Sequence, residues 1–144
     1  MNHALFKPTA HVDTFARDGL PPFAQWPSLN LEAPYAYPDQ LNAAVVLLDN
    51  AVREGHGNRT AIVARDMAGN WSKTTYGELQ QHTDRIAHVL VRDLGFVTGN
   101  RVLLRGYNGM MLAAAWLAVL KAGGVAITTM PMLRATELQT VMQK

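Results

Sequence analysis

The chain has 144 residues, of which 49% are hydrophobic and 17% are charged, a balance that suits one globular domain with a sizeable core. Its 13 Lys and Arg and 11 Asp and Glu are scattered along the chain, which argues against a basic stripe for nucleic acid. The absence of cysteine excludes disulfides and thiol catalysis, and no apolar run is long enough to span a bilayer, so we expect a cytoplasmic protein without a membrane partner.

Residues 1–38 form a segment rich in proline and aromatic side chains. Six of the seven prolines lie here, and they oppose a regular helix. The aromatic residues are too many for a solvated linker: Phe6, Phe15, Phe23, Trp26, Tyr35 and Tyr37. We therefore expect an extended arm that docks across another surface of the protein.

A helix and a hairpin are predicted next. Asp39 has the side chain of an N-cap, and apolar residues then recur at helical spacing as far as Gly55. From Thr60 the period changes, and TAIVARD and WSKTTY are short runs of the kind found in strands. The residues between them, including Asp66, Gly69 and Asn70, favour a turn, so these runs predict a β-hairpin.

The next helix has a clear start signal. Thr75-Tyr76-Gly77-Glu78 has the form of a capping box, in which hydroxyl and carboxylate satisfy amides that the first helical turn leaves unpaired. Apolar positions then share one face of a helix that is expected to end near Gly95. On the opposite face, Asp84 and Arg85 are interpreted as solvated charges.

Two more strands and helices are predicted in the second half of the chain. The run RVLLRGY over 101–107 predicts a strand, and Asn108 is expected to cap a helix over 110–121. That helix is apolar almost all round and should be buried on most sides, with core residues that include Met110, Met111 and Trp116.

The stretch LAVLKAGGVAITTMP joins this helix to a strand. Gly123 suits the left-handed position at a helix end, and the β-branched run over 125–129 predicts a buried strand that stops before Pro131. A weaker helical pattern follows over 134–144.

The order hairpin, helix, strand, helix, strand, helix predicts two crossover connections and an α/β fold with a partly parallel sheet. A parallel sheet needs cover on both faces, and these elements do not supply it. We therefore interpret residues 39–144 as an incomplete α/β subdomain, either a fragment of a larger enzyme or a chain whose second copy supplies the cover.

No motif assembles a catalytic site. Residues 105–109, RGYNG, lie where a strand should meet a helix, a place where free amides can hold a phosphate. A tight turn is the better interpretation, because the phosphate motifs GxxxxGKS/T and GxGxxG are absent. The histidines lack metal-ligand spacing, and neither Ser28 nor Ser72 lies in GxSxG. We assign no catalytic residue and no metal ligand.

Several motifs nevertheless occur in a recognisable order: TYGEL from Thr75, RIAHVL from Arg85, GNRVLLRGYN from Gly99, LAVLKAGGVAITTMP from Leu117 and RATEL from Arg134. This succession resembles the N-terminal region of the AMP-forming acyl-CoA ligases, in the adenylate-forming superfamily. With AHVDTFARDGLPPFAQWP over 10–27, the chain is most similar to the 2-aminobenzoate and benzoate CoA ligases. The resemblance covers essentially the whole chain.

The resemblance implies a two-step reaction on a small-molecule carboxylic acid. The carboxylate attacks the α-phosphate of ATP to give an acyl-adenylate and pyrophosphate, and the thiol of coenzyme A then displaces AMP, with Mg²⁺ screening the phosphates. The family's Ser/Thr/Gly-rich phosphate loop, its acidic adenosine-binding motifs and its C-terminal catalytic lysine have no match in this sequence. The segment alone is therefore expected to be inactive.

One cofactor-binding residue is implied by the family pattern. Family members often carry a basic residue shortly after the proline of the last strand, near the nucleotide of coenzyme A. Here Met132 and Leu133 follow Pro131, so Arg134 is the residue implied to contact a coenzyme A phosphate. An ordinary surface arginine in the first helical turn is the alternative.

Two other functions stay open at this point. The first is a free-standing interaction module that pairs with a second copy through its uncovered apolar face. The second is the same segment of another adenylating enzyme, such as a fatty-acyl ligase or a peptide-synthetase domain, which would differ only in its substrate.

Overall fold

The computed structural model describes residues 9–28, 37–38 and 40–143. Phe6, Tyr35 and the expected N-cap Asp39 lie outside these residues. The elements, in chain order, are α1 (Phe15–Asp18), η2 (Phe23–Gln25), η3 (Val45–Asp49), η4 (Val52–His56), β1 (Thr60–Arg65), β2 (Trp71–Thr75), α2 (Tyr76–His88), η5 (Val89–Asp93), β3 (Arg101–Arg105), α3 (Met110–Lys121), β4 (Val125–Thr129) and α4 (Ala135–Met142). No helix among the described residues is long and apolar enough to cross a membrane.

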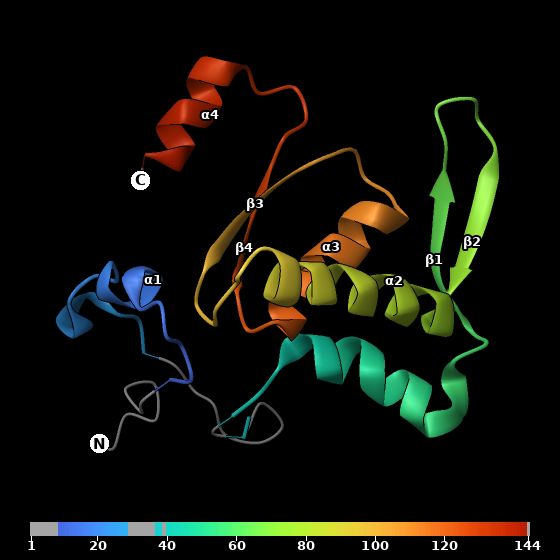
Figure 1. Ribbon diagram of the computed structural model, residues 1–144, viewed down its shortest axis with the longest axis horizontal. Coiled ribbons are helices and arrows are strands. Elements are labelled where there is room, and N and C mark those ends of the chain that lie inside the picture. The colour runs from blue at the N-terminus through green and yellow to red at the C-terminus, as the bar shows by residue number, and fades with distance from the viewer. Residues whose placement is uncertain (1–8, 29–36, 39, 144) are drawn as a thin grey trace.

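The strands form two small sheets. β1 and β2 pair antiparallel, and β3 and β4 pair in parallel with Arg101 opposite Val125 and Arg105 opposite Thr129. The α/β class with a hairpin and a parallel pair is confirmed, but in the described part of the chain only β3–α3–β4 is a crossover within one sheet. The expected second crossover is wrong, because α2 leads from the hairpin into a separate sheet (Figure 1).

Helix α3 lies at the centre of the fold, against α2 and against both parallel strands. Ala114 and Leu117 of α3 join Ala44, Leu48 and Leu79 in one buried cluster. Met110 and Trp116 pack against this cluster as expected, whereas Met111 is 56% exposed. The interpretation of Met111 as a core residue is wrong because it lies on a side of α3 that these elements leave open.

Two of the expected helix ends have the predicted chemistry. The Glu78 backbone N–H donates to Thr75 Oγ1, and the Thr75 backbone N–H donates to Glu78 Oε2, so the capping box is confirmed. Gly123 follows α3 with φ 78°, the left-handed conformation that glycine adopts without a Cβ penalty.

Two caps differ from the prediction. Helix α3 starts after Gly109 without a side-chain cap, so the expected capping by Asn108 is wrong. The first long helix, the helical run over 43–56 that contains η3 and η4, is capped by Asn42, whose Oδ1 accepts the backbone N–H groups of Ala44 and Val45. The Nδ2 of Asn42 also donates to the carbonyl of Leu120, so one side chain joins the start of this helix to the end of α3.

A half-buried ion-pair cluster ties three helical segments together. Lys121, at the end of α3, donates from Nζ to Asp49 of η3 at 2.7 Å and to Asp84 of α2. Asp84 is therefore an ion-pair partner and its interpretation as a solvated charge is wrong, while Arg85 is exposed as expected. Burial tends to lower the pKa of Lys121, but the hydrogen bonds and charges of the two carboxylates raise it above its usual 10.5.

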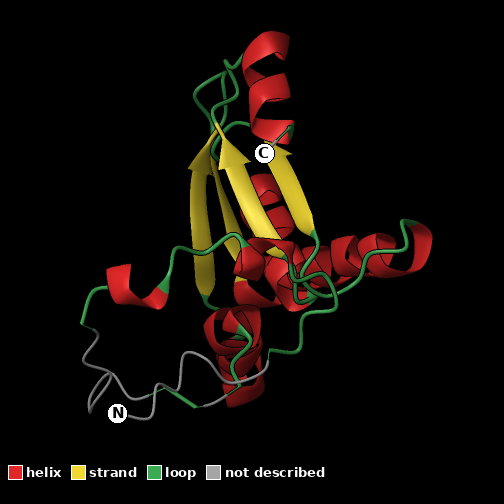
Figure 2. Ribbon diagram, turned by 90° about the vertical axis from the view of Figure 1, so that its left-hand side faces the viewer, coloured by secondary structure: helices red, strands yellow, loops and turns green. Residues whose placement is uncertain are grey.

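The N-terminal segment contains two short helical turns, α1 and η2, where only extended chain was expected. The run from Thr9 to Leu20 holds no proline, which leaves α1 free to form. Among its aromatic side chains, Phe15 and Phe23 stay 50% and 42% exposed. In both views α4, which follows β4, stands apart from the other helices (Figures 1 and 2).

The ion-pair cluster predicts an alkaline stability limit. The Lys121→Met substitution leaves the carboxylates of Asp49 and Asp84 without their shared cation. The loss should lower the unfolding free energy by about 2 kcal/mol at pH 8. The contribution of the Asp84 ion pair to this value is the smaller one, because Asp84 is half-exposed and solvent screens its charge. Because the pKa of Lys121 is higher in the folded state, the ion pairs stabilise the fold fully below pH 10.5, the usual pKa of lysine. This stabilisation is lost as the pH rises through the folded-state pKa of Lys121. Urea unfolding should show a smaller difference in unfolding free energy between the unaltered chain and the Lys121→Met variant at pH 11 than at pH 8. An equal difference at both pH values contradicts this assignment.

The buried hydroxyl of Thr83 predicts a stabilising substitution. Thr83 is fully buried on the same face of α2 as Leu79, and its Oγ1 has no hydrogen-bond partner among the described residues. Thr83→Val keeps the shape and removes the unpaired hydroxyl, so it should raise the unfolding free energy by about 1 kcal/mol. Thr83→Ser keeps the hydroxyl and loses a buried methyl group, and should lower it by about 1 kcal/mol. Urea midpoints measure both; a loss of stability in the valine variant would contradict the account.

Candidate functional site

The candidate functional site is the edge where the two parallel strands end. β3 ends at Arg105 and β4 at Thr129, and ligands of open α/β sheets bind outside the carboxyl ends of such strands. Arg105 does not point a free guanidinium at this edge. Its Nη2 donates to the carbonyls of Pro131 at 2.7 Å and Leu133 at 3.0 Å, so it fastens the loop after β4 to the end of β3.

Arg134, the residue implied to meet coenzyme A, directly follows this fastened loop. It is exposed, and its backbone N–H donates to Glu137 Oε2 at 2.7 Å where α4 begins. Arg105 holds the carbonyl of Leu133 and Glu137 accepts from the backbone N–H of Arg134, so both partners of the peptide group that precedes the Arg134 side chain are fixed. The residues between β3 and α3 bend at Asn108 and Gly109, with Gly109 in an extended conformation, and the tight turn expected over 105–109 is not assigned there.

Beside this edge lies an apolar groove of about 550 Å³. Its lining includes Leu112 and Trp116 of α3, Ile62 of the hairpin and Tyr76 of α2, and Thr128 of β4 contributes a polar hydroxyl. Such a surface can hold an apolar group but offers no charge to orient a ligand.

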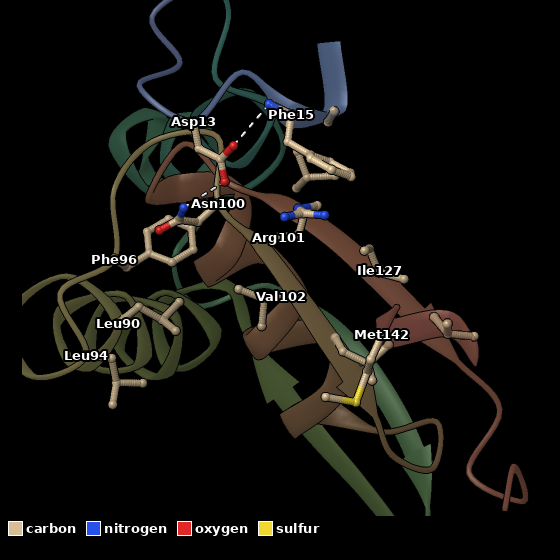
Figure 3. Close-up of a pocket in the computed structure, with 14 residues that line it drawn as sticks. Asp13, Phe15, Leu90, Leu94, Phe96, Asn100, Arg101, Val102, Ile127 and Met142 are labelled. Carbon is tan, nitrogen blue, oxygen red and sulfur yellow. Dashed lines mark hydrogen bonds between the residues drawn. The ribbon is translucent and has the colours of Figure 1, made fainter. Parts of the chain in front are cut away.

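A larger groove, of about 860 Å³, lies over the parallel strands away from α3 (Figure 3). Side chains alternate across a strand, so Val125 and Ile127 share the face that opens into it. Leu94 and Phe96 form one wall, and Phe15 of α1 closes one end. The sequence indicated an uncovered sheet face but did not indicate that the N-terminal segment borders it.

The perturbed carboxylates all have structural causes. The pKa of Asp13 is lowered mainly by the hydrogen bond from Asn100, that of Asp66 by the amide of Asn70 in the hairpin turn, and that of Glu78 by the backbone N–H of Thr75. None of them lies at the carboxyl ends of β3 and β4. Within 9–28, 37–38 and 40–143, no group of three His, Cys, Asp or Glu is placed to hold a metal ion. The described edge therefore offers a mounting for Arg134 but no acid–base pair.

Comparison with protein families identifies the fold's relatives. Residues 48–144 match the family described as AMP-binding enzyme. A salicyl-AMP ligase / salicyl-S-ArCP synthetase of Mycobacterium tuberculosis is 36% identical over 107 residues, which are 74% of this chain and 15% of that protein. An uncharacterised acyl-CoA ligase, YtcI of Bacillus subtilis, is 34% identical over 83 residues, or 58% of this chain and 16% of that protein.

Solved structures agree with this match. A benzoate CoA ligase from Burkholderia xenovorans superposes with a TM-score of 0.60 at 30% identity over 72% of this chain and 20% of its own. An anthranilate CoA ligase, AuaEII, solved with anthranoyl-AMP, has a TM-score of 0.58 at 17% identity over 69% and 18%, which supports the fold alone. The chain thus spans about a sixth of the length of the two curated relatives above. Its ordered motifs, its β3–α3–β4 unit and the family match over 48–144 together show that the chain belongs to the AMP-binding enzymes, the adenylate-forming ligases, and corresponds to part of their N-terminal region.

Proposed function

We propose that this chain is the N-terminal scaffold of an ATP-dependent aromatic acid CoA ligase. The observation that carries the proposal is the family match over 48–144, to which the similarity with a benzoate CoA ligase structure adds the aromatic acid. In this proposal residues 1–38 are an arm and residues 39–144 an incomplete subdomain. The protein would work in the cytoplasm on a small carboxylic acid.

The proposed reaction joins the acid to AMP with release of pyrophosphate and then transfers the acyl group to the thiol of coenzyme A. The described residues do not fit a magnesium–ATP site, because they hold no cluster of three potential metal ligands and the sequence has no glycine-rich phosphate loop. The ATP and Mg²⁺ sites are therefore assigned to polypeptide outside this chain, and no step of the chemistry is assigned to its residues.

The part of this chain in the reaction is to place Arg134. Arg105 and Glu137 hold the peptide group between Leu133 and Arg134, and the exposed Arg134 side chain is proposed to reach a phosphate of coenzyme A. The proposal thus combines a family pattern with a local mounting that the sequence did not indicate.

Two alternative functions would use the same surfaces differently. Another adenylating enzyme, such as a fatty-acyl ligase, would keep the scaffold and change only the acid. A self-associating module would use the groove over β3 and β4, whose apolar lining is open, as the contact with a second copy. A monomer by sedimentation, without hydrophobic dye binding, argues against the module.

The catalytic proposal is tested by pyrophosphate exchange. The isolated 144-residue chain with ATP and Mg²⁺ should show no exchange above background with benzoate, 2-aminobenzoate or a medium-chain acid. A full-length ligase that contains the chain should show exchange with the two aromatic acids, and preference for the medium-chain acid favours the fatty-acyl alternative. Exchange catalysed by the isolated chain would contradict the scaffold proposal.

The role of Arg134 is tested in the same full-length protein. Arg134→Gln should raise the KM for coenzyme A about tenfold, the expected effect of losing one charge-assisted hydrogen bond, and leave pyrophosphate exchange unchanged because adenylation precedes coenzyme A binding. Arg85→Gln, which removes an exposed arginine from α2, serves as the control and should alter neither value. An unchanged KM in the Arg134 variant would show that Arg134 is an ordinary surface residue.

A further inference from the structure

We propose that residues 10–15 form a strap that docks in a site built by residues 98–101, closes one end of the groove over β3 and β4, and opens that groove when it is released. The proposal concerns the chain's own conformation and does not depend on the ligase activity. Its basis is a set of contacts between segments more than eighty residues apart in sequence.

Backbone hydrogen bonds hold the strap in one register. The N–H groups of Val12 and Asp13 donate to the carbonyl oxygen of Thr98 at 3.0 and 2.9 Å. In return, Thr98 Oγ1 donates to the carbonyl of Ala10 at 2.8 Å. The strap and Thr98 each donate and each accept hydrogen bonds. These bonds therefore fix the register of the strap along the loop and do not merely hold the two segments close together.

Side chains make the docking specific. Asn100 Nδ2 donates to Asp13 Oδ2 at 2.9 Å, while Asp13 Oδ1 accepts the backbone N–H of Phe15 at 3.0 Å. That turn brings the Phe15 ring against Arg101, whose guanidinium carbon lies 3.6 Å from the ring centroid (Figure 3). The Asp13 carboxylate thus faces the Asn100 amide, and the Phe15 ring faces the Arg101 guanidinium. A strap shifted along the loop could not make both contacts.

The loop beneath the strap must approach it closely. Gly99 is buried with φ 91°, and a Cβ added there would lie 2.0 Å from the carbonyl oxygen of Asp13. Any side chain at this position therefore displaces the strap. Gly95 offers a matched comparison, because it also has a positive φ, 64°, but an added Cβ would meet no atom within 4 Å.

The strap is a wall of the groove as well as a contact. Asp13, Phe15 and Ala16 line it together with Leu94 and Phe96 from the connection between α2 and β3. Phe15 remains 50% exposed, so the strap is held from one side only. A short segment with so few buried contacts belongs to the least stable part of a fold and can open without global unfolding.

Chymotrypsin cleavage after Phe15 in the intact 144-residue chain measures strap release. Asn100→Asp keeps an acceptor for the Val97 backbone N–H but sets a carboxylate against Asp13. The expected result is cleavage after Phe15 that is about tenfold faster, since proteolysis follows the population of the open form, with more hydrophobic dye bound in the groove. Cleavage after Phe23, beyond the strap, should keep its rate and serves as an internal reference.

An exchange variant separates docking from a general loss of stability. The double variant Asp13→Asn/Asn100→Asp swaps donor and acceptor across the same contact, so cleavage after Phe15 should return to within about twofold of the unaltered chain. Gly99→Ala should release the strap as strongly as Asn100→Asp, whereas Gly95→Ala should not.

Three results would overturn the proposal. They are an unchanged rate of Phe15 cleavage in Asn100→Asp, a double variant that is cleaved as fast as this single variant, and equal effects of the two glycine substitutions. Each would show that residues 10–15 do not depend on the 98–101 site.

Discussion

The need to cover helix α3 determines the arrangement of the other elements. Met110–Lys121 carries a single charged side chain, so the helix is stable in water only when its surroundings are apolar. α2 and η3 supply Leu79 and Leu48 on one side, and the parallel strands cover another. The hairpin and the first long helix are positioned through these contacts, because they pack on the same buried cluster. The fold is therefore one layer of helices around α3 with a small parallel sheet beside it.

Polar side chains hold the ends of the helices and strands that pack against α3. Asn42 joins the start of the first long helix to the carbonyls that end α3, and Lys121 joins that same end to η3 and α2. Arg105 performs the corresponding task at the other edge, where it holds the loop after β4. Apolar packing alone would allow α3 to slide or rotate against its neighbours, whereas these directional bonds specify one register. The polar and charged side chains of Asn42, Lys121 and Arg105 therefore stabilise the fold.

Sequence reasoning succeeded for most local interactions, although the expected cap at Asn108 was wrong. The capping box of Thr75 and Glu78, the hairpin turn at Asp66 and Asn70, and the left-handed Gly123 each involve residues within a few positions of one another. It failed where the partner is distant in sequence: Asp84 lies 37 positions from Lys121, and periodicity places it on a polar face without indicating that partner. For the candidate site, the sequence indicated Arg134 through a family pattern. It could not indicate that Arg105, 28 positions from Leu133, would hold the loop.

The carboxylates of the described residues are largely engaged in structural hydrogen bonds and ion pairs. Asp13, Asp66 and Glu78 each accept hydrogen bonds that hold them ionised, and Asp49 and Asp84 share Lys121. Asp13, Asp66 and Glu78 are poor general bases, because their lowered pKa weakens their hold on a proton at neutral pH. A residue such as Arg134, exposed on a fixed backbone, is suited instead to binding a charged ligand. Among the described residues, the hydrogen bonds that stabilise the fold therefore occupy the carboxylates named above, which makes these groups unsuited to proton transfer.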